Sequence, residues 1–246
     1  MQNNRVVLVH GFTGTNESWG DVATQLVPTF EVAPVELPGH GGSSDVRLDF
    51  EPAAAAIGDT GGRAAYVGYS MGGRLCLRLA VDRPDLVSAL VVIAASPGIV
   101  SADDRATRRE ADERLAVSIE RDGTEQFLQR WLSHPLFVTL DPSPEELARR
   151  RRNTPEGLAS ALRQLGPGAQ EPLWHRLGEL RMPVLVMVGE RDMKFLATSR
   201  QMLDAGLQAR LEIVPGVGHA VHLEDPEACG RIIREFLAGA PHQPSS

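Results

Sequence analysis

The stretch AAYVGYSMGGRLCLRLAVD at residues 64–82 constrains the fold more than any other part of the chain. It opens with six small, β-branched or aromatic residues, which is typical of a strand buried on both faces. It closes with the apolar spacing of a helix. Between the two, Gly68, Ser70 and Gly72 form the pattern G-x-S-x-G, whose small residues allow a sharp turn from strand to helix. This unit predicts a parallel sheet with a serine hydroxyl raised above one edge.

The same alternation of strand and helix runs along most of the chain. Strand-like apolar runs lie at residues 5–10, 30–36, 64–69, 86–95, 183–190 and 209–214, and helical patterns at about 19–27, 52–57, 72–82, 194–205 and 226–238. This order predicts an α/β fold built on a doubly wound, mostly parallel sheet.

The alternation is interrupted between residues 99 and 176. Amphipathic, charge-rich segments alternate there with prolines, which predicts three or four helices and no strand. We therefore expect a single structural domain. Its core would be formed by residues 1–97 and 178–246, and residues 98–177 would be inserted as a helical cap.

Polar residues follow two of the predicted strands. The carboxyl ends of parallel strands share one edge of a sheet, and ligands bind there. Asp192 follows the run 183–190 and His219 follows the run 209–214, so both should lie near Ser70. A serine nucleophile needs a base, and the base needs an orienting acid. We predict a catalytic triad of Ser70, His219 and Asp192.

Other polar residues near these strand ends have structural interpretations. We expect His222 to pack or to bond nearby backbone, Asp225 to cap a helix and Glu190 to brace its loop. Negative charge that develops on a reacting oxygen needs donors. We predict that the backbone N–H groups of Phe12 and Met71 form this oxyanion hole, and that His10 holds the loop HGFTGT rather than taking part in catalysis.

Five runs, HGFTG, LPGHGGS, VGYSMGGR, VGERDMKF and GVGHAVHLEDP, together resemble the α/β hydrolases, whose triads also follow the chain order Ser, Asp, His. Narrower signals resemble one branch, the 2-succinyl-6-hydroxy-2,4-cyclohexadiene-1-carboxylate (SHCHC) synthases of menaquinone biosynthesis. They are Arg74 directly after Ser-x-Gly-Gly, the run G-E-R-D-x-K-F, and the phrase SPGIVSADDRATRREAD…WLSHPLF in the predicted cap. The similarity covers nearly the whole chain.

The resemblance implies a carbon–oxygen lyase with the active site of a hydrolase. In that family the serine, activated by its histidine, removes a proton next to the succinyl ketone of 2-succinyl-5-enolpyruvyl-6-hydroxy-3-cyclohexene-1-carboxylate. The oxyanion hole then holds an enolate, and pyruvate is expelled from the ring. A hole suited to a tetrahedral oxyanion also suits an enolate oxygen. No cofactor is implied.

The resemblance also implies a site for a small polycarboxylate. Arg74, Arg108 and Arg151 match the family's arginines, Trp131 matches a tryptophan of its pocket, and Tyr69 beside the nucleophile is expected to border the same space. Guanidinium groups bind carboxylates through two parallel hydrogen bonds. Solvated arginines are the alternative interpretation, because only Lys194 among the 25 basic residues is a lysine. For Trp131 the alternative is helix packing.

The register of the third arginine is open. In the segment EELARRRRN, Glu145 and Glu146 can pair with arginines four residues later. This leaves Arg151 and Arg152 without local partners, so either one could face the pocket.

Composition and motifs exclude several other classes. The net charge of −7 argues against nucleic acid or an anionic membrane as a general partner. We expect no metal site, since His219 and His222 alone make a weak case, and no nucleotide motif occurs. Cys76 and Cys229 are expected as buried thiols. The apolar run VVLV is too short for a signal peptide or a membrane span, so we expect a cytoplasmic protein without membrane insertion. The oligomeric state stays open.

Two other functions compete with the lyase. One is a serine hydrolase, either a carboxylesterase or a carbon–carbon bond hydrolase, acting on a small acidic substrate. The other is a binding protein without activity on the same fold. A complete triad argues against the binding protein, because binding alone requires no nucleophile, base and acid.

Overall fold

The computed structural model describes residues 4–239, which form a six-stranded sheet with the strand order β2-β1-β3-β4-β5-β6. The strands are β1 (Arg5–Val9), β2 (Glu31–Val35), β3 (Ala64–Tyr69), β4 (Val87–Ile93), β5 (Val184–Gly189) and β6 (Arg210–Val214). Each neighbouring pair is parallel. The predicted doubly wound sheet is confirmed.

Burial along the strands follows their place in the sheet. The inner strands β3 and β5 are buried along their whole length, which explains their continuous apolar sequences. The edge strands β2 and β6 are only partly buried. Pro34 lies in β2, where an edge strand can accept a residue that lacks a backbone N–H.

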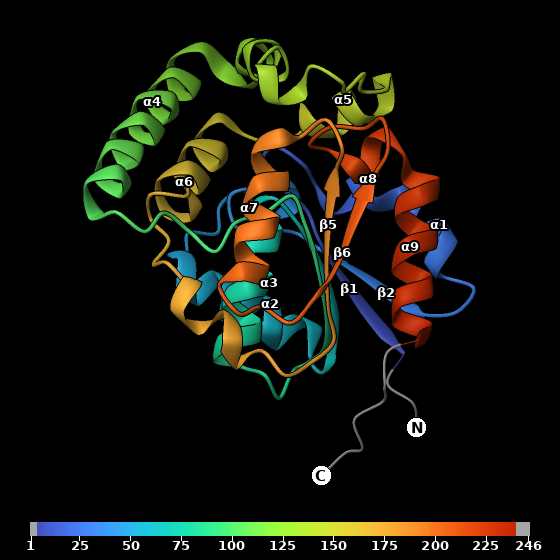
Figure 1. Cartoon of the computed structure of the whole chain (residues 1–246). Coiled ribbons are helices and arrows are strands. Elements are labelled where there is room, and N and C mark those ends of the chain that lie inside the picture. The colour runs from blue at the N-terminus through green and yellow to red at the C-terminus, as the bar shows by residue number, and fades with distance from the viewer. Residues whose placement is uncertain (1–3, 240–246) are drawn as a thin grey trace.

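Helices cover both faces of the sheet (Figure 1). They are α1 (Gly20–Leu26), α2 (Phe50–Gly61), α3 (Met71–Asp82), α7 (Met193–Asp204), α8 (Val221–Glu224) and α9 (Pro226–Gly239). α1 and α9 pack on one face, where Trp19 and Ile233 are fully buried. α2, α3 and α7 pack on the other, around Leu75 and Met202. The free thiols Cys76 and Cys229 are buried on these opposite faces, as expected, and burial raises the pKa of both.

Helix α2 is longer than the sequence predicts. The sequence pattern predicts a helix over about residues 52–57, but α2 runs from Phe50 to Gly61 and so includes two glycines, Gly58 and Gly61. A β-carbon on Gly58 would collide with Leu79, and one on Gly61 would collide with Tyr66. These glycines therefore allow α2 to lie close to α3 and the sheet, and the close packing offsets their low helix propensity.

A layer of helices lies over the carboxyl ends of the strands (Figure 1). It contains α4 (Ala102–Leu132), α5 (Pro144–Arg150) and α6 (Pro155–Leu165). Gly123, with φ 80° and ψ 166°, divides α4 into two helical parts. An apolar cluster that includes Ile119, Phe127 and Leu158 joins α4 to α6. These helices fall within the predicted cap; the division into residues 98–177 and a core stays a prediction.

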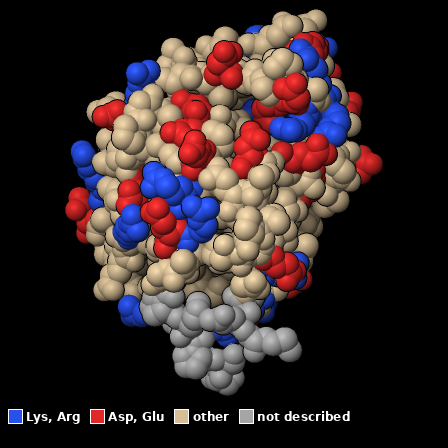
Figure 2. Space-filling view, turned by 90° about the vertical axis from the view of Figure 1, so that its right-hand side faces the viewer, with Lys and Arg blue, Asp and Glu red and all other residues tan. Residues whose placement is uncertain are grey.

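Charged side chains of both signs are interspersed on the side that carries α1 and α9 (Figure 2). Some form exposed ion pairs, such as that between Arg231 and Glu235 at 3.5 Å. Exposed pairs of this kind contribute little to stability. Within residues 4–239, no helix has the length and apolarity needed to cross a membrane.

Substitution of Gly72 tests the close approach of α3 to the sheet. A β-carbon there would collide with the carbonyl oxygens of Val9 and His10, which are backbone atoms and cannot move away cheaply. Gly72→Ala should lower the free energy of unfolding by about 3 kcal/mol or more. The matched control is Gly20→Ala, because Gly20 lies in a helix at a point where an added β-carbon would project into open space. Chemical denaturation should show the control within about 1 kcal/mol of the parent protein; equal losses in both variants would contradict the packing argument.

Candidate active site

Ser70 stands at a sharp turn between β3 and α3. Its backbone has φ 49° and ψ −107°, a conformation that costs energy for a residue with a side chain. A β-carbon on Gly68 would collide with the backbone of Gly72, just as one on Gly72 would collide with β1. The close approach of α3 to the sheet therefore forces the turn and exposes the Ser70 hydroxyl at the carboxyl edge of the sheet.

The structure brings Ser70, His219 and Asp192 together. Asp192 follows β5 and caps α7, where its Oδ1 accepts the N–H of Phe195 at 3.2 Å. His219 Nδ1 donates to Asp192 Oδ2 at 2.6 Å, and His219 Nε2 faces Ser70 Oγ at 3.3 Å. The side chains of Asp192 and His219 are almost fully buried, which strengthens their hydrogen bond. In this geometry His219 can take the Ser70 proton while Asp192 fixes its tautomer.

The polar residues beside the triad have other partners. His222 is buried against the Tyr69 ring, with 4.3 Å between the ring centroids, and burial holds its pKa well below the usual range. Asp225 accepts an N–H from the first turn of α9 at 2.9 Å. Glu190 accepts the N–H of Gly216 at 2.9 Å and so braces the loop between β6 and the triad histidine. These contacts agree with the structural interpretations of all three.

Two backbone N–H groups near Ser70 are free to bind an oxyanion. Met71 is the first residue of α3, so its N–H has no intrahelical acceptor. Within residues 4–239, the N–H groups of both Phe12 and Met71 donate no hydrogen bond. The positive end of the α3 dipole adds to their pull on negative charge. Both groups are therefore suited to the predicted oxyanion hole.

His10 supports the loop that carries Phe12. It is fully buried, its Nδ1 lies 2.8 Å from the carbonyl oxygen of Gly11, and its Nε2 accepts the N–H of Leu37 at 3.1 Å. Its Nε2 also lies 2.8 Å from Glu36 Oε1, so the ring is held by three polar contacts. This agrees with the expected structural role.

Arg74 is buried beside the triad without a carboxylate partner. Its guanidinium donates to Gln170 Oε1 at 3.2 Å and to the carbonyl oxygen of Leu165 at 2.6 Å, which are neutral acceptors. Burial and the nearby charge of Arg108 lower the pKa of Arg74 to about 9, so the group stays charged at neutral pH but in an unfavourable environment. A ligand carboxylate would relieve this cost.

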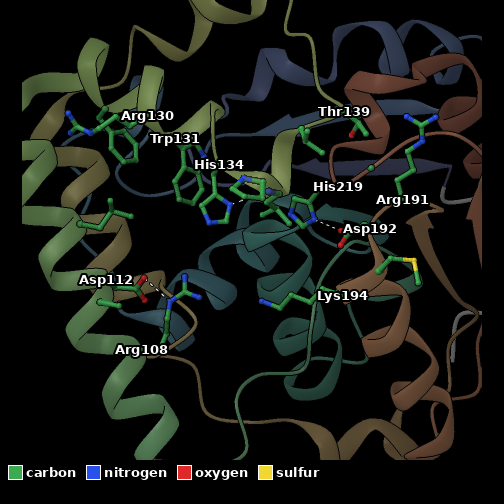
Figure 3. Close-up of a pocket in the computed structure, with 18 residues that line it drawn as sticks. Arg108, Asp112, Arg130, Trp131, His134, Thr139, Arg191, Asp192, Lys194 and His219 are labelled. Carbon is green, nitrogen blue, oxygen red and sulfur yellow. Dashed lines mark hydrogen bonds and ion pairs between the residues drawn. The ribbon is translucent and has the colours of Figure 1, made fainter.

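Arg108 and Lys194 face one another across the same space (Figure 3). Arg108, on α4, donates to Asp112 Oδ1 at 2.9 Å. Burial raises the pKa of Asp112, and its second oxygen has no hydrogen-bond partner within residues 4–239. Lys194, on α7, forms no ion pair with any residue of that range. Three cationic side chains thus point into one region from α3, α4 and α7.

The triad opens on an inner cavity of about 270 Å³ that is lined by Ser70, His219, Arg74 and Arg108 among others. Tyr69 and Trp131 line it as well. Burial raises the pKa of the Tyr69 hydroxyl, which stays protonated. An outer cavity of about 690 Å³ shares Arg108, Trp131, Lys194 and His219 with the inner one and lies between α4 and α7 (Figure 3). This arrangement can bind an anion with apolar surface and bring it to the serine.

Comparison with known proteins agrees with this geometry. The family model described as the alpha/beta hydrolase family matches residues 6–231. The chain belongs to the alpha/beta hydrolase family. Within it, the chain falls with the SHCHC synthases, as the following relatives show.

A Bacillus subtilis (strain 168) protein, provisionally named 2-succinyl-6-hydroxy-2,4-cyclohexadiene-1-carboxylate synthase, is 36% identical over 94% of this chain and 89% of its own length. The synthase of that name from Citrobacter koseri is 32% identical over 90% of this chain and 88% of its own length. The solved structure of MenH from S. aureus superposes with a TM-score of 0.89, at 29% identity over 97% of this chain and 94% of the other. An esterase from Thermogutta terrifontis, 23% identical with a TM-score of 0.79 over 95% of this chain and 89% of its own, shares the fold.

The structure does not place the third predicted arginine, Arg151, in the pocket. Arg151 is half-exposed and pairs with Glu125 at 2.5 Å, and it lines neither cavity. Arg152 pairs with Glu17 at 2.7 Å. The prediction that either of them faces the pocket for want of a partner was wrong, because these partners come from distant segments. The predicted pair of Glu146 with Arg150 is present at 2.8 Å.

Lys194 was missed as a site residue by reasoning from the sequence. The available signal was its place two residues after Asp192 in the run G-E-R-D-x-K-F, combined with its being the one lysine of an arginine-rich chain. Its approach to Arg108 depends on how α7 faces α4, which no local pattern specifies.

His40 generates a prediction about stability and pH. It is fully buried beside the loop at residues 10–15, and its Nε2 accepts the N–H of Thr13 at 3.2 Å. Burial, and to a smaller extent the electrostatic effect of the adjacent His10, lowers the pKa of His40 from 6.5 to about 3. The unfolded chain therefore binds a proton that the folded protein excludes, and stability is lost as the pH falls through this window, by about 1.4 kcal/mol per pH unit.

In His40→Gln this contribution should vanish. Denaturation at several pH values between about 6 and about 4 should show the free energy of unfolding falling less steeply in the variant, by about one proton. His222, whose pKa is also lowered, titrates in both proteins and cancels in the comparison. Equal slopes would contradict the assignment of a neutral, buried His40.

Proposed function

We propose that the protein is an SHCHC synthase, which converts 2-succinyl-5-enolpyruvyl-6-hydroxy-3-cyclohexene-1-carboxylate to SHCHC and pyruvate. The observation that carries this proposal is the combination of a complete triad with Arg74, Arg108 and Lys194 around one cavity. A hydrolase for neutral esters would have no use for three convergent cations. The curated relatives named for this reaction support the same choice.

The triad supplies the proton transfer. His219 takes the Ser70 proton, and the Ser70 oxygen removes the proton next to the succinyl ketone of the substrate. The electron pair of the broken C–H bond delocalises into the ketone, and the resulting enolate oxygen accepts the N–H groups of Phe12 and Met71. When the enolate collapses, the carbon–oxygen bond to the enolpyruvyl group breaks. The departing enolpyruvate takes up the proton that His219 received from Ser70 and becomes pyruvate, which leaves the triad as it began. No water is added and no oxidation state changes overall, so the reaction needs no cofactor.

The cationic side chains would hold the substrate carboxylates. Arg74 is positioned one helical turn from Ser70, which suits a carboxylate near the reacting carbon. Arg108 and Lys194 approach from the other side and suit a second carboxylate. Tyr69 and Trp131 would border the ring. A cytoplasmic location stays a prediction from the sequence.

Removal of the nucleophile tests the reaction class. In Ser70→Ala, pyruvate release measured with a lactate dehydrogenase coupled assay should fall by about 1,000-fold or more in kcat/KM. The parent protein should release pyruvate from the enolpyruvyl substrate and turn over a neutral aryl ester far more slowly. Fast ester cleavage without pyruvate release would overturn the lyase proposal in favour of the serine hydrolase. If the parent protein binds the substrate but shows neither activity, it is instead a binding protein without catalytic activity.

Removal of the arginines tests the anion site. Arg74→Ala should lower kcat/KM by about 100-fold, because a largely desolvated carboxylate loses its partner. Arg108→Ala should lower it less, by about 10-fold, since its side chain is 37% exposed and its charge is better screened. Arg151→Ala, on the surface and outside both cavities, is the matched control and should stay within about twofold of the parent. Losses of equal size in all three variants would contradict the site described here.

A further inference from the structure

Thr13 has an unusual backbone conformation next to the predicted oxyanion donor. It lies in the turn that Gly14 N–H closes onto the carbonyl oxygen of Gly11 at 3.0 Å, and its φ of 67° falls in the left-handed region that glycine or asparagine usually occupies. The residue before it in this turn is Phe12. A β-branched residue in this conformation persists only where its surroundings hold it.

Every polar group of Thr13 is held by a hydrogen bond. Its N–H donates to His40 Nε2 at 3.2 Å, its hydroxyl accepts from Arg150 Nη1 at 2.5 Å, and its carbonyl oxygen accepts from Asn153 Nδ2 at 2.8 Å. Thr13, Arg150 and Asn153 are all buried. Three bonds in different directions fix the rotation of the residue.

Arg150 and Asn153 reach the turn from the helices that cover the sheet. Arg150 is the last residue of α5, and Asn153 lies in the turn that leads to α6. Arg150 is anchored by Glu146 at 2.8 Å, and Glu146 in turn accepts the hydroxyl of Ser18 at 3.0 Å. Asn153 Oδ1 accepts the N–H of Gly41 at 2.8 Å. The junction therefore joins α5 to two loops that follow strands of the sheet.

A buried ion pair is a weak source of stability, because the desolvation of both charges opposes their attraction. The planar guanidinium of Arg150 gives the Thr13 hydroxyl a hydrogen-bond donor of fixed direction, which an apolar side chain cannot provide. The direction matters because the adjoining N–H of Phe12 must point at the reacting oxygen, and small displacements of such donors are costly.

We infer that Arg150 and Asn153 are positioning residues, which hold Thr13 from outside the sheet and thereby aim the Phe12 N–H at the oxyanion. The inference rests on the proposed use of that N–H, but not on the identity of the substrate.

The decisive pair of variants is Thr13→Val and Thr13→Ser. Valine keeps the shape of threonine and removes the acceptor for Arg150, whereas serine keeps the hydroxyl. Two rates are measured: pyruvate release, and phosphonylation of Ser70 by a small alkyl fluorophosphonate, in which a serine oxygen–phosphorus bond forms and fluoride leaves. The phosphonyl oxygen occupies the oxyanion hole, so the second rate needs no natural substrate.

Thr13→Val should lower both the phosphonylation rate and kcat by about 10- to 100-fold, with KM changed by less than about threefold. Thr13→Ser should restore both rates to within about threefold of the parent. Arg150→Met should behave as Thr13→Val does. Arg152→Met is the matched control, because Arg152 is exposed, pairs with Glu17 and donates no hydrogen bond to Thr13, and its rates should be unchanged.

Rates within about twofold of the parent in Thr13→Val, with only a lowered unfolding midpoint, would show that the junction is merely structural and would overturn the inference. If Arg150→Met does not fold, Thr13→Val decides alone, since it exchanges one hydroxyl for one methyl group. A parent protein that reacts with the fluorophosphonate but releases no pyruvate would refute the proposed function, and the Thr13 series would still decide the inference.

Discussion

The contact between the first turn of α3 and strand β1 determines the rest of the site. Because Gly72 lies directly on the carbonyl oxygens at the end of β1, the chain must leave β3 in a turn too sharp for ordinary dihedral angles. The turn presents the Ser70 hydroxyl and leaves the Met71 N–H without an acceptor, so nucleophile and oxyanion donor arise from one packing constraint. The strain at Ser70 is offset by the core that α3 forms with the sheet, where Leu75 is fully buried.

Charge distribution gives this hydrolase-like site its specificity. The chain carries a net charge of −7, yet its inner cavity is lined by Arg74, Arg108 and Lys194. Asp112 offsets part of this charge through Arg108, but Arg74 has only neutral acceptors. The desolvation of Arg74 lowers the stability of the folded protein before any ligand binds. A bound carboxylate would then interact favourably with the buried charge without a further desolvation of Arg74. Binding energy from groups remote from the reacting carbon can then orient the substrate for proton removal.

The sequence specified the parts of the site that depend on short-range geometry. The triad could be predicted because each member directly follows a strand, and the ends of parallel strands lie side by side. Prediction failed where a partner lies far away in the chain. Arg151 was expected in the pocket because it matches the family's third arginine and has no acidic neighbour at helical spacing, but it pairs with Glu125 on α4. Gly58 and Gly61 lie inside α2 despite the low helix propensity of glycine, because they allow the helix to pack closely against its neighbours. Lys194 gains its significance only from the orientation of α7.

The helices α4 and α5, which lie over the carboxyl ends of the strands, are attached by different kinds of contact, and the difference matches their different roles in the site. At the end of α5 the attachment consists of buried polar bonds from Arg150 and Asn153, which have directional geometry and are costly to break singly. Thr124, in the part of α4 that follows Gly123, shares in this attachment through a buried hydrogen bond to the carbonyl oxygen of Asn153 at 2.8 Å. The part of α4 before Gly123 is attached to α6 by an apolar cluster, with exposed ion pairs such as that of Arg163 with Glu113 outside it. Apolar contacts tolerate small shifts better than hydrogen bonds do, because they are not directional. The rigid attachment thus lies beside the oxyanion donors, whose positions must hold to fractions of an ångström, and the more adaptable one carries Arg108, whose task is to meet a carboxylate.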